Sequence, residues 1–257
     1  MVVSQILIYP VKSLDGVSVP QARITGGGIL EFDRIYAFFD ENEKYVNGKR
    51  TPRIQLLRAE FDPEFREMTL GMTDSTERNH FSLTEPAALN RWLSDFFGFS
   101  VRLGAEARSG FPDDRAAPGP TICSEASLAE VCTWYEGLTP ESARRRFRTN
   151  LELGNTLPFE EDRLFGLPDE KRLFRVGDVR FHGHNPCQRC VVPTRDPDSS
   201  EPIPGFQKKF MEMRQKTLPA WSQPLRFNHY YRFAVNTSVP DSEAGKILRV
   251  GDAVSLG

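Results

Sequence analysis

The residues best suited to chemistry in this chain are gathered in one short run, from His182 to Cys190. The run His-Gly-His-Asn-Pro-Cys-Gln-Arg-Cys holds two of the four cysteines and two of the four histidines in the 257 residues. Imidazole and thiolate groups are metal ligands, and a thiolate is also a nucleophile. Metal ligation or nucleophilic attack is therefore the chemistry that this segment could perform.

The residues around this run predict a strand that delivers the cysteines to a turn. Side chains from Val179 to His184 alternate between two faces, as in a β-strand. Pro186 lacks an amide hydrogen and disfavours a helix before it, which predicts that Cys187 to Cys190 form a tight turn at the strand end. A thiol beside Arg189 and Arg180 would have its thiolate stabilised by positive charge.

Four interpretations of the cysteines compete. They are small buried hydrophobic residues, ligands of a structural zinc ion, a redox dithiol, or the source of one thiolate that binds a metal-bearing cofactor. Zinc would use the donors His182, His184, Cys187 and Cys190, but structural zinc sites usually join two ligand pairs that are farther apart. The dithiol lacks the helix-opening context of thioredoxin-type motifs.

The cofactor interpretation requires residues that bind anions elsewhere in the chain. A phosphate-bearing cofactor needs Lys or Arg side chains, hydroxyls and backbone amides. Lys12-Ser13 follows the first predicted strand, Asp33-Arg34 begins another, and the run from Arg144 to Asn150 is the densest basic segment. Each of these could equally be a solvated surface group.

The first hundred residues predict short strands followed by one helix. Segments rich in β-branched and aromatic residues are bounded by Gly, Pro, Asp and Asn, and they cover 4–9, 17–24, 34–40 and 55–61. Apolar residues recur at helical spacing from Ala87 to Phe97, and Gly98 follows as a C-cap. The pattern predicts a small barrel or sandwich that carries one amphipathic helix.

The segment from Gly104 to Gly119 predicts a linker between domains or an active-site loop, because it is poor in apolar residues and rich in Gly, Pro, Asp and Arg. After it, Ser127-Leu-Ala-Glu130 matches a capping box, which predicts a second helix. The remaining chain returns to strands. We therefore expect a β-rich α+β chain with two domains, 1–104 and 105–257.

Composition excludes several classes of protein. The formal net charge is −2, from 33 basic and 35 acidic residues, so no global field recruits nucleic acid or an anionic membrane. The N-terminus lacks the basic segment of a signal peptide, and no apolar stretch reaches the length of a membrane span. We expect a cytoplasmic protein whose cysteines are thiols.

Several segments in order resemble a known family. Ile8-Tyr-Pro-Val-Lys-Ser-Leu-Asp-Gly-Val17, Glu31-Phe-Asp-Arg-Ile-Tyr36 and Thr51-Pro-Arg53 are similar to the N-terminal β-barrel domain that precedes MOSC domains. Four further segments resemble the MOSC domain itself: Ser124-Glu-Ala-Ser-Leu128, Phe147-Arg-Thr-Asn150, Val176-Gly-Asp178, and Pro186-Cys-Gln-Arg-Cys-Val-Val192 followed by Asp196-Pro197. The match spans nearly the whole chain.

The resemblance implies an N-terminal β-barrel-like domain followed by a MOSC β-barrel domain with a few helices, and molybdenum cofactor held between them. The chain is similar to the mitochondrial amidoxime-reducing components and their bacterial counterparts, where the second cysteine of the Cys-x-Arg-Cys segment ligates molybdenum. That position is Cys190 here, which makes it the implied catalytic residue. The implied cofactor contacts are Lys12, Ser13, Arg34, Arg148, Asn150, Gln188, Arg189 and Tyr230, with Tyr231 as an alternative to Tyr230.

The implied reaction is reduction of N-hydroxylated compounds, or of N- or S-oxides, with electrons from a separate reductase or ferredoxin-type partner. His182 and His184 are candidates for the proton donor. The alternative function is a carrier of molybdenum cofactor or sulfur without turnover. The chain departs from the family pattern at three places. Gln188 replaces a frequent Ser, and Ala117-Pro-Gly-Pro-Thr121 stands where relatives carry a Ser or Thr or a short Gly-containing loop. The segment after Asp196-Pro197, up to Pro224, is divergent and Pro-rich, which predicts a different substrate.

Overall fold

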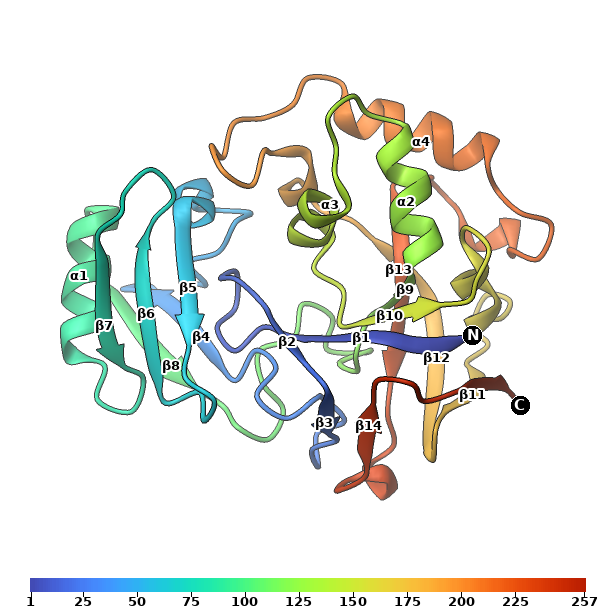
Figure 1. The fold of residues 1–257 in the computed structure, drawn as a ribbon, viewed down its shortest axis with the longest axis horizontal. Helices are drawn as coiled ribbons and strands as arrows, with labels where there is room; N and C mark the ends of the chain where they lie inside the picture. Colours follow the sequence, from blue (N-terminus) through green and yellow to red (C-terminus); the bar gives the residue numbers. More distant parts are fainter.

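The computed structural model describes all residues 1–257 as two lobes rich in β-structure (Figure 1). Its strands are β1 Val2–Ile8, β2 Val17–Val19, β3 Gln21–Arg23, β4 Tyr36–Asp40, β5 Leu57–Phe61, β6 Glu67–Met72, β7 Arg78–Ser82, β8 Val101–Ala105, β9 Ile122–Ser124, β10 Leu151–Gly154, β11 Arg172–Val176, β12 Val179–Gln188, β13 Arg232–Ser238, β14 Ile247–Arg249 and β15 Val254–Leu256. Its helices are α1 Ala87–Phe97, α2 Glu125–Thr133, α3 Pro140–Phe147 and α4 Phe206–Lys216.

The larger lobe is built on an eight-stranded sheet in the order β15-β11-β12-β13-β9-β10-β1-β2. The sheet curls, because the amide of Val3 donates to Asp252 O at 2.8 Å and the amide of Val254 donates to Met1 O at 3.0 Å. Its concave side encloses a buried apolar cluster that includes Ile6 and Phe181. The same sheet contains β12, which carries the cysteines, and β1 and β10, which precede and follow other predicted site residues.

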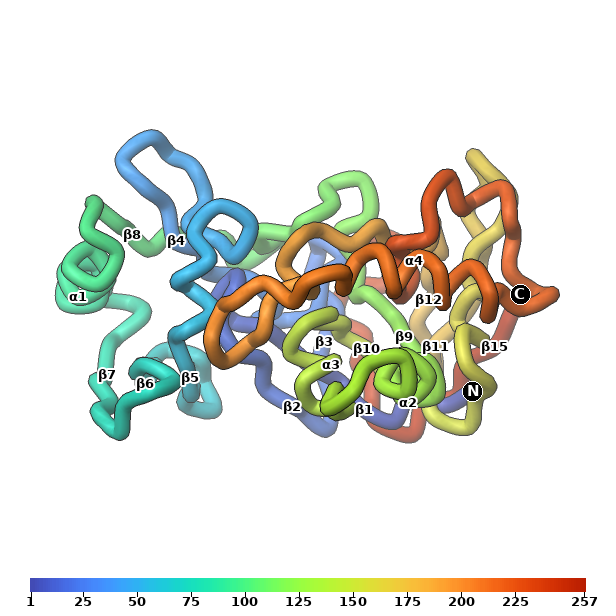
Figure 2. The backbone as a smooth tube through the Cα atoms, turned by 90° about the horizontal axis from the view of Figure 1, so that it is seen from above, coloured from blue at the N-terminus to red at the C-terminus, as the bar shows by residue number.

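The smaller lobe contains β4 to β8 and α1. Strands β4 and β8 pair antiparallel, and β5, β6 and β7 form a separate three-stranded sheet. Helix α1 has the predicted bounds: Leu89, Leu93 and Phe97 are buried on one face, and Gly98 ends the helix at φ +80°. A left-handed residue at this position favours glycine. Figure 2 shows this lobe at one end of the molecule and both chain termini at the other.

The prediction of a β-rich α+β fold is confirmed, although the sheets do not form closed barrels. The predicted boundary at residue 104 stays a prediction. Strands β1 and β2 pair within the large sheet, and β3 pairs with β14 near the C-terminus, so the first residues of the chain pack with its last half. None of the helices is both long enough and apolar enough to cross a membrane.

Two local predictions are wrong. The N-cap of α2 is Ser124, whose side chain accepts from the Ser127 amide, because the Ser127 hydroxyl instead donates to buried Glu161 at 2.8 Å. The strand that carries the cysteines does not stop before Pro186 but continues to Gln188. Register shifts on either side of Pro186 let the strand pass a residue that cannot donate to the ladder.

Candidate functional site

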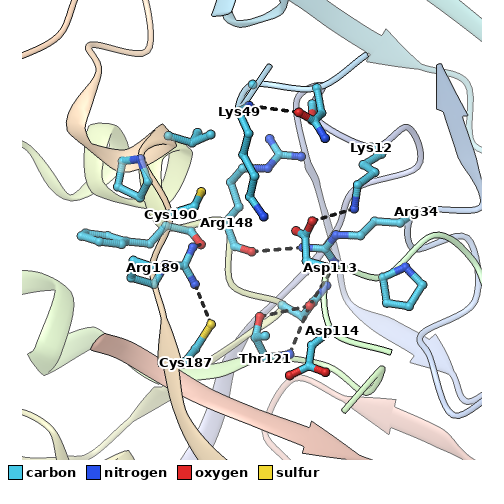
Figure 3. A pocket seen from close by; sticks show the side chains of 18 of the residues that line it. Lys12, Arg34, Lys49, Asp113, Asp114, Thr121, Arg148, Cys187, Arg189 and Cys190 are labelled. Carbon is cyan, nitrogen blue, oxygen red and sulfur yellow. Dashed lines mark hydrogen bonds and ion pairs between the residues drawn. The ribbon is translucent and has the colours of Figure 1, made fainter. Parts of the chain in front are cut away.

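A cavity of about 670 Å³ lies between the two lobes, at the end of β12 (Figure 3). Segments far apart in the sequence line it, and they include the loop from Ser109 to Gly119 that the sequence predicts as a linker or active-site loop. The cavity brings together eight of the nine predicted site residues: Lys12, Ser13, Arg34, Arg148, Asn150, Gln188, Arg189 and Cys190.

Lys12 enters the cavity from the turn after β1. Its side chain is 7% exposed, and its ammonium donates to Asp113 Oδ1 at 2.7 Å and to Phe111 O at 2.9 Å. Burial lowers the pKa of Lys12, and the carboxylate of Asp113 opposes that shift. The ammonium is therefore held charged in a place where water is scarce, which is suited to binding an anion.

Arg34 joins the two lobes at the floor of the cavity. Its Nη1 pairs with Asp33 and lies 3.3 Å from Asn150 Oδ1, and its Nη2 donates to Arg148 O at 3.3 Å. Burial is the largest influence on Arg34, but the nearby carboxylate of Asp33 outweighs it and raises the pKa of the guanidinium. Arg34 thus stays charged and fixes the backbone that presents Arg148.

Asn150 organises the same floor through hydrogen bonds of both its side-chain oxygen and its side-chain nitrogen. Its Oδ1 accepts from Arg34 and from both the amide and the hydroxyl of Thr121 at 3.2 Å, and its Nδ2 donates to Leu7 O at 3.0 Å. Because these bonds tie Asn150 to β1, to Thr121 and to Arg34, Asn150 positions its neighbours in the floor.

Arg148 is the cation of the floor that has an unsatisfied donor. It caps α3 with φ 52° and ψ 50°, its guanidinium lies 4.2 Å from the centre of the Tyr9 ring, and its buried Nη2 has no hydrogen-bond partner. Burial, with the charge of Arg34, lowers the pKa of Arg148. A buried donor without a partner carries a desolvation penalty that an anion in the cavity would remove.

Three predicted site residues share an unusual backbone conformation. Ser13, Arg34 and Arg148 have φ values of 74°, 52° and 52°, in the left-handed region that costs a residue with a side chain about 1–2 kcal/mol. They come from three separate segments and converge on one cavity. Strain of this kind concentrates at functional sites, where the surrounding structure holds it.

The end of β12 places two thiols on the cavity wall. Arg189 lies between them, donating from Nη1 to Cys187 Sγ at 3.2 Å and from Nη2 to Phe147 O, while its buried Nε has no partner. The sulfurs of Cys187 and Cys190 point to opposite sides of Arg189 (Figure 3). This arrangement disfavours the redox dithiol and leaves both thiols as separate groups facing the cavity.

The remaining candidates from the sequence lie outside the cavity. His184 contacts Ser238 Oγ at 2.7 Å, and neither it nor His182 lines the cavity, so neither is placed to give a proton there. No three His, Cys, Asp or Glu side chains are grouped as metal ligands, which rules out the zinc site built from all four. Tyr230 stacks on Phe227 instead of lining the cavity, and Tyr231 is buried.

Sequence reasoning missed several residues of the cavity, above all Lys49, Arg58, Asp113 and Arg232. Arg232 opens β13, two residues after the predicted Tyr230, and donates from Nη1 to Pro186 O at 2.8 Å. No local pattern singles these residues out, because each follows a different strand or loop. The alternating pattern of β13 could have identified Arg232 as the end of a strand beside β12.

The cavity is strongly positive. Ten of its lining residues are Lys or Arg and four are Asp. Five of the cations have no carboxylate partner: Lys49, Arg115, Arg148, Arg189 and Arg232. Unpaired cations with buried, unsatisfied nitrogen atoms match a large anionic ligand, and an accessible thiol beside them can bind a soft metal.

Comparison with known proteins assigns this architecture to a family. A model described as the MOSC N-terminal beta barrel domain matches residues 1–100, and one described as the MOSC domain matches residues 121–255. The chain belongs to the MOSC family. The cavity of this MOSC protein lies between segments from both matched regions.

Similar proteins fall into two kinds. The chain is 26% identical to mitochondrial amidoxime reducing component 2 of Bos taurus and 24% identical to component 1 of Homo sapiens, in each case over 77% of this chain and 67% of the relative. It is 22% identical to the molybdenum cofactor sulfurase of Oryza sativa subsp. japonica, over 76% of this chain but 28% of that protein. The chain thus spans only about a quarter of the sulfurase's length. The name of the sulfurases refers to molybdenum cofactor, and the name of the other kind refers to the reduction of amidoximes.

Proposed function

We propose that this MOSC protein is an oxidoreductase that binds molybdenum cofactor and reduces N-hydroxylated small molecules, or N- or S-oxides. The observation that carries the proposal is the convergence of buried, unpaired cations and an accessible Cys190 thiol in one cavity. The name of the amidoxime reducing components, to which the chain is similar along most of its length, supports the reaction class.

The residues fit an anionic, metal-bearing pterin cofactor. Lys12, Arg34 and Arg148 would neutralise its phosphate. The Nη2 of Arg148, which has no hydrogen-bond partner, would donate to that group. Ser13, Gln188 and Arg189 would contact the pterin, and Cys190 would supply the thiolate ligand. When bound, the cofactor supplies a two-electron metal centre for oxygen-atom transfer.

In the reaction, the chain's own residues would bind the cofactor, orient it and supply the positive charge around it. Arg189 keeps its positive charge, because the sulfurs of Cys187 and Cys190 raise its pKa against the effect of burial. The guanidinium of Arg189 donates to Cys187 Sγ at 3.2 Å and to Phe147 O, which anchors the segment that carries both cysteines. Arg34 donates to the backbone carbonyl of Arg148 and to Asn150, which fixes the position of Arg148 in the floor of the cavity.

Electrons would come from a separate protein, because the reaction consumes two electrons per substrate and no redox cofactor other than molybdenum is proposed for this chain. A reductase or a ferredoxin-type protein is the class of donor we propose. The substrate is a small molecule, and neither nucleic acid nor a membrane surface is expected as a partner.

A carrier function is the second candidate, and the similarity to molybdenum cofactor sulfurases favours it. In that case the cavity would hold the cofactor, or Cys190 would hold sulfur, without turnover. One experiment separates the two functions. The protein is expressed in a host that makes molybdenum cofactor, its metal content is measured, and it is supplied with a chemical reductant and benzamidoxime. Bound molybdenum with formation of benzamidine supports the oxidoreductase, whereas bound molybdenum without product supports the carrier.

A further inference from the structure

Lys49 is a cation of the cavity that has no partner. Both lysines that line the cavity are drawn in Figure 3: Lys12 is engaged by Asp113, whereas the Lys49 side chain extends from the rim into the cavity. Its ammonium makes no ion pair or hydrogen bond. Its charge nevertheless reaches the site: burial would raise the pKa of Asp113, but Lys12, Arg34 and, to a smaller extent, Lys49 lower it.

The turn that carries Lys49 is fixed to the segment that follows Cys190. The side chain of Asn47 accepts from the amide of Lys49 at 3.1 Å, which closes the turn. Arg195 donates from Nη1 to Gly48 O at 2.7 Å, and a Cβ on Gly48 would lie 3.0 Å from Val192 Cγ2. The turn therefore rests on the residues directly after Cys190, and the ammonium of Lys49 is held on the same side of the cavity as that thiol.

Two of the four carboxylates of the cavity are neutralised by ion pairs, and the other two accept hydrogen bonds from backbone amides. Asp33 pairs with Arg34, and Asp113 pairs with Lys12. Asp15 accepts from the amide of Ala59 at 2.9 Å, and Asp114 accepts from the amide of Ala116 at 2.9 Å. A cationic substrate would therefore meet two unpaired carboxylates in the cavity, whereas an anionic one would meet five unpaired cations.

Exposure separates Lys49 from the cations assigned to the cofactor. Lys12 is 5% exposed overall and Arg34 and Arg148 are partly buried, but Lys49 is exposed at the rim. A cofactor that stays bound is held by the buried cations, while a substrate that enters and leaves meets the exposed one first. An unpaired rim cation also raises the local concentration of anions near the entrance.

We propose that Lys49 recognises an anionic group on the substrate, so that the site selects N-oxygenated compounds that carry a carboxylate or phosphate over neutral or cationic ones. This inference rests on the proposed reductase function. It names a substrate class for that function and assigns Lys49, which acts by binding and takes no part in the proton or electron transfer.

The test compares two substrates that differ in charge, a benzamidoxime with a para-carboxylate and its neutral methyl ester. The holoenzyme, its Lys49→Gln variant and a Lys44→Gln control are assayed for kcat/KM with both compounds. Lys44 is an exposed lysine of the same hairpin that does not line the cavity. Binding of each compound to the same three proteins is measured by calorimetry, at low and at high salt, without reductant.

We expect the wild type to prefer the carboxylate, and Lys49→Gln to reduce that preference about two- to fivefold through KM, as the loss of one charge-assisted contact at an exposed site implies. High salt should reduce the preference in the wild type and in the control alike. An unchanged preference in Lys49→Gln, or equal binding of acid and ester by the wild type, would overturn the inference. Failure to turn over either compound, with the binding preference intact, would instead count against the reductase function alone.

Discussion

Arg148 offers a test in which stability and binding are expected to move in opposite directions. Its backbone lies at φ 52° and ψ 50°, which any residue with a Cβ adopts only with strain, and glycine adopts without it. Its guanidinium is desolvated in the cavity, and one nitrogen has no partner. If the residue is kept for binding an anion, replacing it with glycine should relieve backbone strain in the cofactor-free protein and weaken the complex.

The comparison between Arg148→Gly and Arg148→Ala isolates the backbone contribution. Both variants lose the same guanidinium and the same contact with the Tyr9 ring at 4.2 Å, so these losses cancel between them. The remaining difference is the left-handed backbone, which favours the glycine variant by about 1–2 kcal/mol in the free energy of unfolding. For a chain of this size, each 1 kcal/mol corresponds to roughly 2–4 °C in Tm.

Both variants should also lose affinity for the anion. A hydrogen bond to a charged group contributes about 1.5–3 kcal/mol, so molybdenum retention should fall by tenfold or more in each. Urea unfolding of the cofactor-free proteins measures the first effect, and molybdenum per protein after gel filtration measures the second. If the alanine variant is as stable as the glycine variant, the strain argument fails; if either variant retains molybdenum as the wild type does, the assignment of Arg148 fails.

Three further substitutions have expected outcomes. Burial raises the pKa of Glu161 to about 7, so the folded state holds a proton that the unfolded state loses from about pH 4.5 upward. The free energy of unfolding should therefore fall by ~3 kcal/mol between pH 4.5 and 7. Glu161→Gln should remove this dependence on pH in urea unfolding measured across the same range. Asp198 accepts from Arg58 at 2.9 Å and so links β5 to the segment after Cys190; because its side chain is 57% exposed, Asp198→Ala should cost under ~1 kcal/mol in unfolding but lower molybdenum retention measurably. Asp113→Asn should raise the affinity of the cofactor-free protein for inorganic phosphate, because it removes the carboxylate that is paired with the Lys12 ammonium. Calorimetry measures this affinity. An unchanged affinity would show that Asp113 does not compete with phosphate for Lys12.

The sequence predicts elements well where the signal is local. Helix α1 lies where the apolar spacing and Gly98 predict it, because its buried face and its C-cap both depend on residues that are close together in the sequence. The start of α2 is predicted three residues late, since two serines compete for the cap and only the tertiary contact of Ser127 with Glu161 decides between them. The continuation of β12 through Pro186 also depends on a partner strand, β13, that follows much later in the chain.

The site is predictable to the extent that family motifs carry it. The motif residues from Lys12 to Cys190 do meet in one cavity, although they come from both lobes. Lys49 and Asp113 could not be found in this way, because their roles arise from loops that meet only in the folded chain. Tyr230 was predicted from its place near a C-terminal strand, yet it stacks on Phe227, and Arg232 is the residue of that region that reaches the cavity.

The central claim is that the Cys190 thiolate binds molybdenum in a basic cavity, and metal analysis of three proteins tests it most directly. Wild type, Cys190→Ser and Cys187→Ser are expressed in a host that makes molybdenum cofactor and purified identically, and molybdenum per protein is measured for each. We expect near-stoichiometric metal in the wild type, strong loss in Cys190→Ser and much smaller loss in Cys187→Ser. Wild-type protein without molybdenum, or equal retention in Cys190→Ser and wild type, would contradict the account.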